Sequence, residues 1–107
     1  MNVFEKIIAG ELPCKKVLEN EHFLAFEDIN PKACVHVLAI PKKSIKDFQS
    51  ADFETLAGLG EFIKEVAKKL GIEKSGYRVI SNIGADGGQE VPHLHFHILG
   101  GEKLGGF

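Results

Sequence analysis

Three histidines alternate with apolar residues near the end of the chain, at His93, His95 and His97. Side chains two apart on an extended strand share a face, so the intervening apolar residues can fill the core while the imidazoles line the opposite face as a row. Imidazole has an ordinary pKa of about 6.5, which suits it to proton exchange near neutral pH. A solvated face would not need the same titratable residue three times, so the row predicts a catalytic centre.

Two kinds of chemistry could use this row. Three imidazoles could bind zinc, but on a straight strand the outer two Cα atoms would lie about 13 Å apart, so His36 or a cysteine would have to join the metal. Alternatively, one histidine attacks phosphorus while its neighbours orient it and move protons. The second chemistry needs phosphate-binding groups nearby. The glycine-rich segment 84–89 can present main-chain N–H groups to an anion, although a plain tight turn explains such a segment equally well.

The rest of the chain limits the kind of protein that carries this row. Its 107 residues fit one domain, and 44% hydrophobic with 26% charged residues is a globular composition. A formal net charge of -2 argues against a groove for a nucleic-acid polymer, which would need a basic stripe. We expect no export signal and no membrane span, and we expect Cys14 and Cys34 to be reduced thiols in a cytoplasmic protein.

Apolar periodicity and turn residues predict two helices and five strands. Helices are expected over residues 3–9 and from an N-cap at Ser50, through an apolar stripe that starts at Phe53, to a stop at Gly71. Strands are expected over residues 16–19, 22–27, 35–40, 77–83 and 93–99. This order lacks the long crossovers of parallel sheets, so we expect an α+β fold whose mostly antiparallel sheet carries its helices on one side.

Two glycines interrupt the long predicted helix, at Gly58 and Gly60. Each costs about 1 kcal/mol relative to alanine in a helix interior. Close approach of another backbone, for example the same helix of a second copy, would offset this cost. The other interpretation is that the helix simply tolerates both.

Several segments together resemble the histidine triad (HIT) superfamily. Residues 87–101 are similar to its signature, and three more segments resemble its opening helix, its nucleoside-binding turn and the strand that carries a fourth histidine: 4–13, 24–31 and 36–42. The resemblance points to the Hint branch, which comprises nucleoside phosphoramidases and nucleotide-binding proteins. It implies a single HIT domain over residues 1–107, with a five-stranded sheet, two helices, and sheets joined across a two-fold axis in a homodimer.

The resemblance also implies a mechanism. His95 would attack the α-phosphorus of a purine nucleoside phosphoramidate or an aminoacyl-type adenylate, and water would then release a nucleoside monophosphate from the nucleotidyl-histidine. His97 and His36 would contact phosphate oxygens or manage protons, and His93 would support His95. The expected ligand is a purine nucleotide of the AMP or GMP type, and no metal or other cofactor is required.

The resemblance places the remaining ligand contacts around these histidines. Asp28 matches the residue that accepts hydrogen bonds from the ribose hydroxyls, a role compatible with a simple turn before Pro31. The residues expected to form the purine slot, each equally plausible as ordinary core, are Ile29, Phe26, Ile7 and Leu12. The residues expected on the phosphate side are Asn82, Gly88, Gln89 and Glu90.

Glu90 departs from the better-known members of the family, which carry serine or threonine there. A carboxylate beside a phosphate repels it unless the carboxylate is protonated or turned away. Glu90 is therefore expected to contact the substrate through its backbone or to assist a cationic amine leaving group. Two other functions stay open: a non-enzymatic nucleotide-binding adaptor and a zinc-dependent hydrolase.

Overall fold

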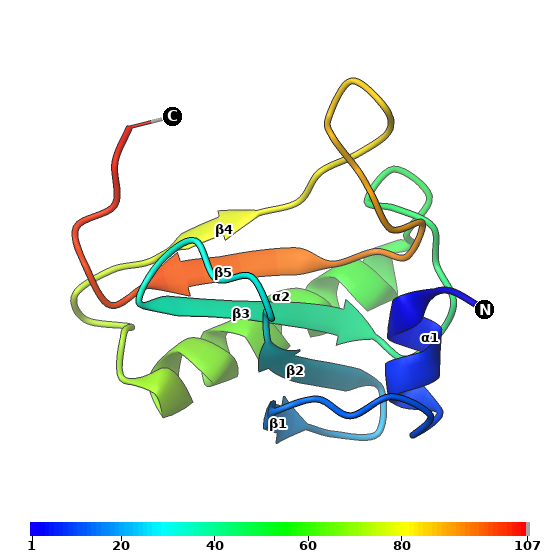
Figure 1. Cartoon of the computed structure of the whole chain (residues 1–107), viewed down its shortest axis with the longest axis horizontal. Coiled ribbons are helices and arrows are strands. Elements are labelled where there is room, and N and C mark those ends of the chain that lie inside the picture. Colours follow the sequence, from blue (N-terminus) through cyan, green and yellow to red (C-terminus); the bar gives the residue numbers. More distant parts are fainter. Residues whose placement is uncertain (107) are drawn as a thin grey trace.

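A computed structural model of the chain describes residues 1–106 and shows one antiparallel sheet with two helices (Figure 1). The helices are α1 (Val3–Ile8) and α2 (Phe53–Leu70). The strands are β1 (Lys16–Glu19), β2 (Phe23–Glu27), β3 (Val35–Pro41), β4 (Arg78–Ile80) and β5 (Phe96–Gly100). They lie in the order β1-β2-β3-β5-β4, and every neighbouring pair is antiparallel. The α+β fold with five strands and two helices is confirmed.

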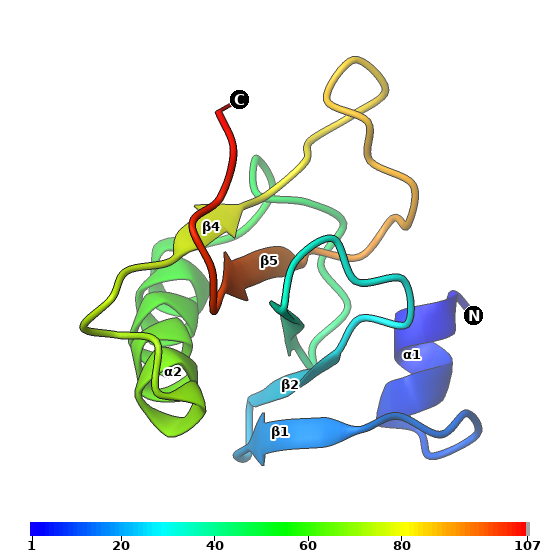
Figure 2. The ribbon, with the colours of Figure 1, turned by 60° about the vertical axis from the view of Figure 1, so that its left-hand side comes forward.

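The central strand β3 has two buried faces. Val37 and Ala39 pack on the α2 side together with Ile98 of β5. Leu38 and Ile40 point the other way and form a second cluster with α1. The two helices lie on opposite sides of the sheet (Figure 2), so the expectation that both share one side was wrong. Continuous apolar runs in β2 and β3 need cover on both faces, and α1 covers the second one.

Helix α2 starts at a different cap from the one predicted. Asp52 is the N-cap, and its carboxylate accepts from the N–H of Thr55 at 2.8 Å. Ser50 is instead held in the preceding turn, where its N–H donates to the carboxylate of Asp47 at 2.9 Å. Gly71 ends the helix as expected, with a φ of 73°. The helix face that enters the core consists of Leu59, Phe62, Ile63, Val66 and Ala67.

The structure gives the two helix glycines different surroundings. A Cβ at Gly58 would lie 2.9 Å from Cζ of Phe23, so a larger residue there would force the ring or the helix to shift. It is therefore a side chain of this chain, and not another backbone, that approaches Gly58. A Cβ at Gly60 would meet nothing within 4 Å among the described residues. Phe53, the first residue of the predicted stripe, is 84% exposed and lies outside the core.

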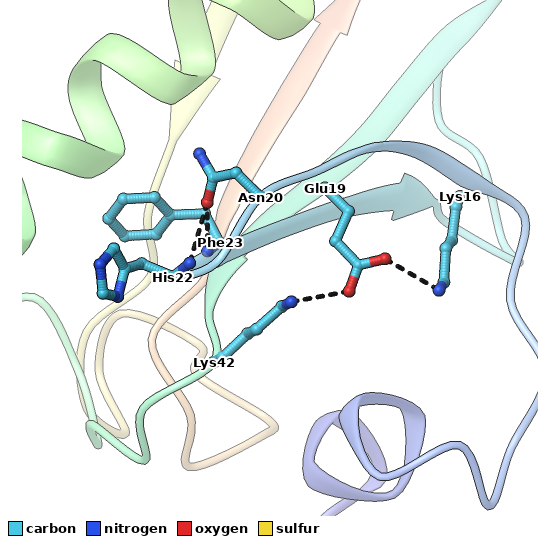
Figure 3. A network of polar contacts seen from close by, with 6 residues as sticks. All are labelled: Lys16, Glu19, Asn20, His22, Phe23 and Lys42. Atoms are coloured by element: carbon cyan, nitrogen blue, oxygen red, sulfur yellow. Dashed lines mark hydrogen bonds and ion pairs between the residues drawn. The ribbon is translucent and has the colours of Figure 1, made fainter.

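The turn between β1 and β2 is closed by polar side chains (Figure 3). Asn20 Oδ1 accepts from the N–H groups of His22 at 3.0 Å and Phe23 at 2.8 Å. The Glu19 carboxylate lies 2.7 Å from Nζ of Lys42, which ties β1 to the chain that follows β3. His22 lies on this turn and is exposed (Figure 3).

The last strand begins at Phe96 and not at His93 as predicted. Its pairing with β3 stops at the pair Ala39–Phe96. Pro41, at the end of β3, has no N–H to extend the ladder, and its carbonyl accepts from the ring of His93 at 2.9 Å. Strand β4 is also shorter than the predicted span 77–83, and it lies at the edge of the sheet.

The structure also bears on the expectations that the chain has no membrane span and that its cysteines are reduced. Neither helix in residues 1–106 combines the length and the apolar character needed to cross a membrane. Cys14 and Cys34 are both free thiols.

Candidate active site

Three imidazoles meet on the sheet face that α1 covers. The ring of His97, on β5, has its centroid 5.1 Å from that of His36 and 5.3 Å from that of His95. His36 reaches this place from β3, because the register pairs it with Leu99 and puts its side chain beside that of His97. His95 comes from the irregular segment before β5. His36 and His95 are 6% and 8% exposed, so the cluster is largely withdrawn from water.

The three alternating histidines, His93, His95 and His97, therefore do not form a row of equivalent side chains on one strand. Of the three, only His97 lies within β5, because that strand begins at Phe96. The prediction for the apolar partners is confirmed: Leu94 and Ile98 are buried under α2, and Phe96 packs against them. The alternation sorts side chains correctly between the two faces even where the backbone is not a strand.

The ring of His95 is held by a main-chain carbonyl. Its Nδ1 lies 2.6 Å from the carbonyl oxygen of His93, which can only accept, so Nδ1 carries the proton. Burial lowers the pKa of His95, as does the neighbouring His93, and the ring is therefore neutral near pH 7. Its Nε2 then holds a lone pair. This is the arrangement of a nucleophilic or basic nitrogen.

His93 is fully buried and holds its neighbours in place. Its Nε2 donates to the carbonyl of Pro41 at 2.9 Å, and its Nδ1 has no hydrogen-bond partner among the described residues. Phe4 of α1 packs edge-on against both rings, with centroids 6.0 Å from His93 and 5.0 Å from His95. Phe4 was not singled out as a site residue from the sequence. The helical spacing of apolar residues in 3–8 was the signal that could have placed it against the site.

His36 is contacted at both ring nitrogens. The N–H of Lys32 donates to Nδ1 at 3.0 Å, and Nε2 lies 2.9 Å from Nδ1 of His97. An oxygen of the Asp28 carboxylate lies 3.4 Å from the same Nε2. The other Asp28 oxygen accepts from the N–H of Asn30 at 2.8 Å, so the turn expected of Asp28 is present.

The imidazoles of His36 and His97 are both uncharged near pH 7. The pKa of His97 is lowered to about 4, mainly by burial and further by the neighbouring His95 and His36, against the smaller opposing effect of Asp28. Burial likewise lowers the pKa of His36. Near pH 7 these rings therefore act as donors or acceptors through single N–H groups, and not as fixed cations.

The proposed purine slot is only partly assembled. Phe26 is buried in the α1-side cluster, and Ile7 packs against the same cluster. Leu12 is 38% exposed and Ile29 is 91% exposed, so neither belongs to the ordinary core. The structure thus brings Ile7 and Phe26 together beside Phe4 and leaves the other two at the surface.

The glycine-rich segment forms a closed turn. The N–H of Gly88 donates to Ala85, and that of Gln89 donates to Gly84, both at 3.0 Å. Gly84 and Gly88 have φ of 70° and 77°, which favours glycine at both positions. Two main-chain N–H groups expected to face an anion are thus satisfied inside the turn, and the tight-turn alternative describes them. A phosphate contact here stays a prediction.

Side chains on either side of this turn hold it in place. The Gln89 carboxamide accepts from the N–H of Gly84 at 3.0 Å and donates to the carbonyls of Lys46 at 2.8 Å and Val91 at 3.0 Å. Asn82 donates to the carbonyl of Gly87 at 2.8 Å. Both predicted phosphate-side amides therefore have main-chain partners. Glu90 is exposed, so its carboxylate can stay hydrated without entering the site.

Comparison with known proteins identifies this arrangement. A family model described as the HIT domain matches residues 9–104. The chain belongs to the HIT domain family. An uncharacterized HIT-like protein of Helicobacter pylori is 61% identical over 103 residues, which cover 96% of this chain and 99% of that protein.

Two solved structures share the same HIT architecture. A HIT family hydrolase from Legionella pneumophila has a TM-score of 0.91 at 40% identity, covering 96% of this chain and 95% of that one. A histidine triad nucleotide-binding protein from Candida albicans has a TM-score of 0.86 at 34% identity, covering 92% and 73% of the two chains.

One group in this HIT domain has the composition of a metal site. Ligand atoms of Asp28, His36 and His97 all lie within 4.8 Å of one another. A metal-bound histidine normally donates its second ring N–H to an acceptor. The second nitrogen of His36 does the opposite, because it accepts from the N–H of Lys32. The hydrogen bond at Nδ1 of His36 therefore does not suit a metal bound at Nε2 of that residue.

Proposed function

We propose that this HIT domain is a nucleotide hydrolase that cleaves purine nucleoside phosphoramidates or aminoacyl-type adenylates through a nucleotidyl-histidine intermediate. The observation that carries the proposal is the hydrogen bond from Nδ1 of His95 to the carbonyl of His93. It leaves Nε2 with a lone pair in a buried, neutral ring. A neutral imidazole fixed by its other nitrogen is the form in which histidine attacks phosphorus.

The proposed reaction has two steps. In the first, Nε2 of His95 forms a bond to the α-phosphorus while the bond from phosphorus to the leaving group breaks; an amine leaving group takes up a proton, whereas the carboxylate of an adenylate leaves as the anion. In the second, a water oxygen forms a bond to phosphorus and gives its proton to a neighbouring imidazole or to solvent, the bond to Nε2 breaks, and the nucleoside monophosphate leaves. His97 lies beside His95 and is the group we assign to proton donation or to a phosphate oxygen, with His36 behind it.

Binding of the nucleoside is assigned to the residues around α1 and the 28–32 turn. Asp28 can accept from ribose hydroxyls, because its carboxylate lies at the margin of the imidazole cluster. Ile7 and Phe26 supply apolar surface for a purine, and the exposed Ile29 and Leu12 can close over it. The name of the Candida relative supports a nucleotide ligand. We keep the adenine or guanine monophosphate as the expected product.

Replacement of the nucleophile tests this proposal. His95→Ala should lower phosphoramidate turnover by about 10⁴-fold or more, because no other group forms the covalent bond. Binding of AMP to the same variant, measured by calorimetry, should stay within about tenfold of wild type because the purine and ribose contacts are untouched. Substantial residual hydrolysis would overturn the assignment of His95.

Two rivals give different results in the same assay. A nucleotide-binding adaptor would show affinity for AMP and no product with the wild-type chain. A zinc-dependent hydrolase would lose activity with a chelator and regain it with zinc. We favour the metal-free reaction because Nδ1 of His36 accepts from the N–H of Lys32, whereas a metal-bound histidine would donate from that nitrogen.

We also propose that the domain works in the cytoplasm, in keeping with its free thiols.

We further propose that two copies associate through the β4 edge and the adjoining face of α2. A hollow of about 380 Å³ lies there, lined mostly by apolar groups. Val79 and Ile80 of β4 are 42% and 37% exposed, which is high for apolar strand residues. An edge strand with apolar side chains is a ready surface for strand pairing. The residues lining the hollow are Phe48, Leu56, Gly60, Ile63, Lys64, Tyr77, Val79 and Phe96.

A further inference from the structure

We propose that the main-chain amide of Lys32 fixes the proton positions of two histidines in series, first His36 and then His97. The N–H of Lys32 donates to Nδ1 of His36 at 3.0 Å. An amide N–H can only donate, so Nδ1 accepts with its lone pair. A neutral imidazole carries one ring proton, and that proton must then sit on Nε2 of His36.

The second step follows from the contact between the two rings. Nε2 of His36 lies 2.9 Å from Nδ1 of His97. Because the His36 nitrogen carries the proton, it donates, and Nδ1 of His97 accepts. The single proton of neutral His97 is thereby placed on its Nε2. In residues 1–106 the only hydrogen bond that the structure gives His97 is this one through Nδ1, so its Nε2–H is left for a ligand.

The turn over residues 28–32 holds the main-chain N–H of Lys32 in the position from which it donates to Nδ1 of His36. The N–H of Asp28 donates to the carbonyl of His36 at 3.0 Å, and the N–H of Asn30 donates to the Asp28 carboxylate at 2.8 Å. The second carboxylate oxygen lies 3.4 Å from Nε2 of His36, farther away than His97. This negative charge favours a proton on that nitrogen. His36 is thus fixed by one turn at its backbone and at both ring nitrogens.

A different protonation of His36 would break these contacts. A proton on Nδ1 would point at the N–H of Lys32, so neither the other neutral form nor the doubly protonated ring fits. His36 is also 6% exposed, which disfavours a charge on it. The turn therefore selects one tautomer.

This assignment gives the two neighbouring rings opposite functions. His95 carries its proton on Nδ1 and offers a lone pair at Nε2, whereas His97 offers a donor at Nε2. One ring is suited to attack and the other to donate to a phosphate oxygen or a leaving group. This catalytic consequence rests on the proposed function, but the tautomers themselves do not. His36 is on this account a positioning residue that acts through His97.

Nitrogen NMR of the ¹⁵N-histidine-labelled full chain tests the tautomers directly. Nε2 should be the protonated nitrogen of both His36 and His97, and a coupling across the hydrogen bond should connect Nε2 of His36 to Nδ1 of His97. A proton on Nδ1 of either ring, or the absence of that coupling, would overturn the proposal. The spectrum needs no substrate, so failure of the proposed hydrolysis would leave this result unaffected.

Variants of His36 test the catalytic consequence. His36→Leu removes the donor to His97 and should lower kcat by about tenfold or more with a smaller change in KM, since oriented proton transfer contributes about 10²–10⁴-fold. In its spectrum His97 should become a mixture of tautomers. His36→Gln keeps an N–H donor and should recover part of kcat and the single His97 tautomer. The matched control is His22→Leu, on the exposed β1–β2 turn, which should behave as wild type.

Two outcomes would exclude His36 as a positioning residue. One is wild-type kcat in His36→Leu. The other is an equal loss of kcat in His36→Leu and His36→Gln, because a general structural role would not distinguish a side chain that donates from one that does not.

Discussion

At the scale of single residues, main-chain groups orient the imidazoles of this site. The carbonyl of His93 accepts from His95, the carbonyl of Pro41 accepts from His93, and the amide of Lys32 donates to His36. Main-chain groups keep the same hydrogen-bonding character at every pH. They can therefore set which nitrogen of a neutral ring carries the proton, provided that burial keeps the ring neutral.

The neutral cluster predicts how stability depends on pH. Burial and the neighbouring imidazoles together lower the pKa of His97 to about 4, against about 6.5 in the unfolded chain. Because the unfolded state takes up a proton first, this stability is present above about pH 6.5 and is lost as the pH falls toward 4. The loss from this residue is about 2–3 kcal/mol. Urea unfolding between pH 7 and pH 4.5 measures it.

The control for this pH dependence is His97→Gln, which has no ring to protonate. Its unfolding free energy should fall less steeply over the same range than that of the wild type. Equal slopes for the two proteins would contradict the assignment of a strongly lowered pKa to His97.

At the scale of elements, helix α2 depends on a close fit with β2. Gly58→Ala should lower the free energy of unfolding by about 1 kcal/mol, although alanine favours helices, because the new Cβ would lie 2.9 Å from the ring of Phe23. In a Phe23→Leu background the same change should be neutral or stabilising. Thermal unfolding of the four proteins of this cycle measures the coupling. Additive effects would contradict the clash.

The sequence predicts these elements well where the signal is local. The stripe from Leu59 to Val66 follows helical spacing, and Gly71 marks the end of α2. The N-cap was misplaced because Ser50 and Asp52 are both good caps, and the choice depends on the turn that Ser50 closes with Asp47. The start of β5 could not be predicted, because it depends on where its pairing with β3 stops, far away in the sequence.

The candidate site divides in the same way. The spacing of His93, His95 and His97 is enough to predict that they belong to a catalytic site. The resemblance to the HIT superfamily adds His36 and Asp28 to that predicted site. The contribution of Lys32 could not be predicted, because it comes from an amide that every residue except proline possesses. Only the conformation of the 28–32 turn makes that amide meet His36.

At the scale of the whole molecule, the main hydrophobic core and the candidate active site lie on opposite sides of the sheet. The two helices lie on opposite sides of the sheet (Figure 2). The α2 side holds the larger core cluster, whereas the α1 side combines a smaller cluster with the imidazoles. The apolar surface at β4 adjoins the α2 side. Association there through Val79, which pairs with Ile98 of the α2 side, would extend the packed face.

A charge on the exposed edge tests this association. Val79→Lys should convert the proposed dimer to a monomer at micromolar concentration in light scattering, because a lysine cannot be buried against the same apolar surface of a second copy. The matched control is Phe53→Lys, which changes another exposed apolar residue and should leave the mass unchanged. A wild-type chain that is monomeric at high concentration would contradict the dimer.

The central claim is that one imidazole, His95, becomes covalently nucleotidylated. The direct measurement is mass spectrometry of the chain quenched in acid-free conditions milliseconds after mixing with a purine nucleoside phosphoramidate. We predict a transient mass increase of one nucleoside monophosphate residue, mapped by fragmentation to His95 and absent from His95→Ala. Product formation with no adduct at any time, or an adduct on His93, His97 or His36 instead, would contradict the account.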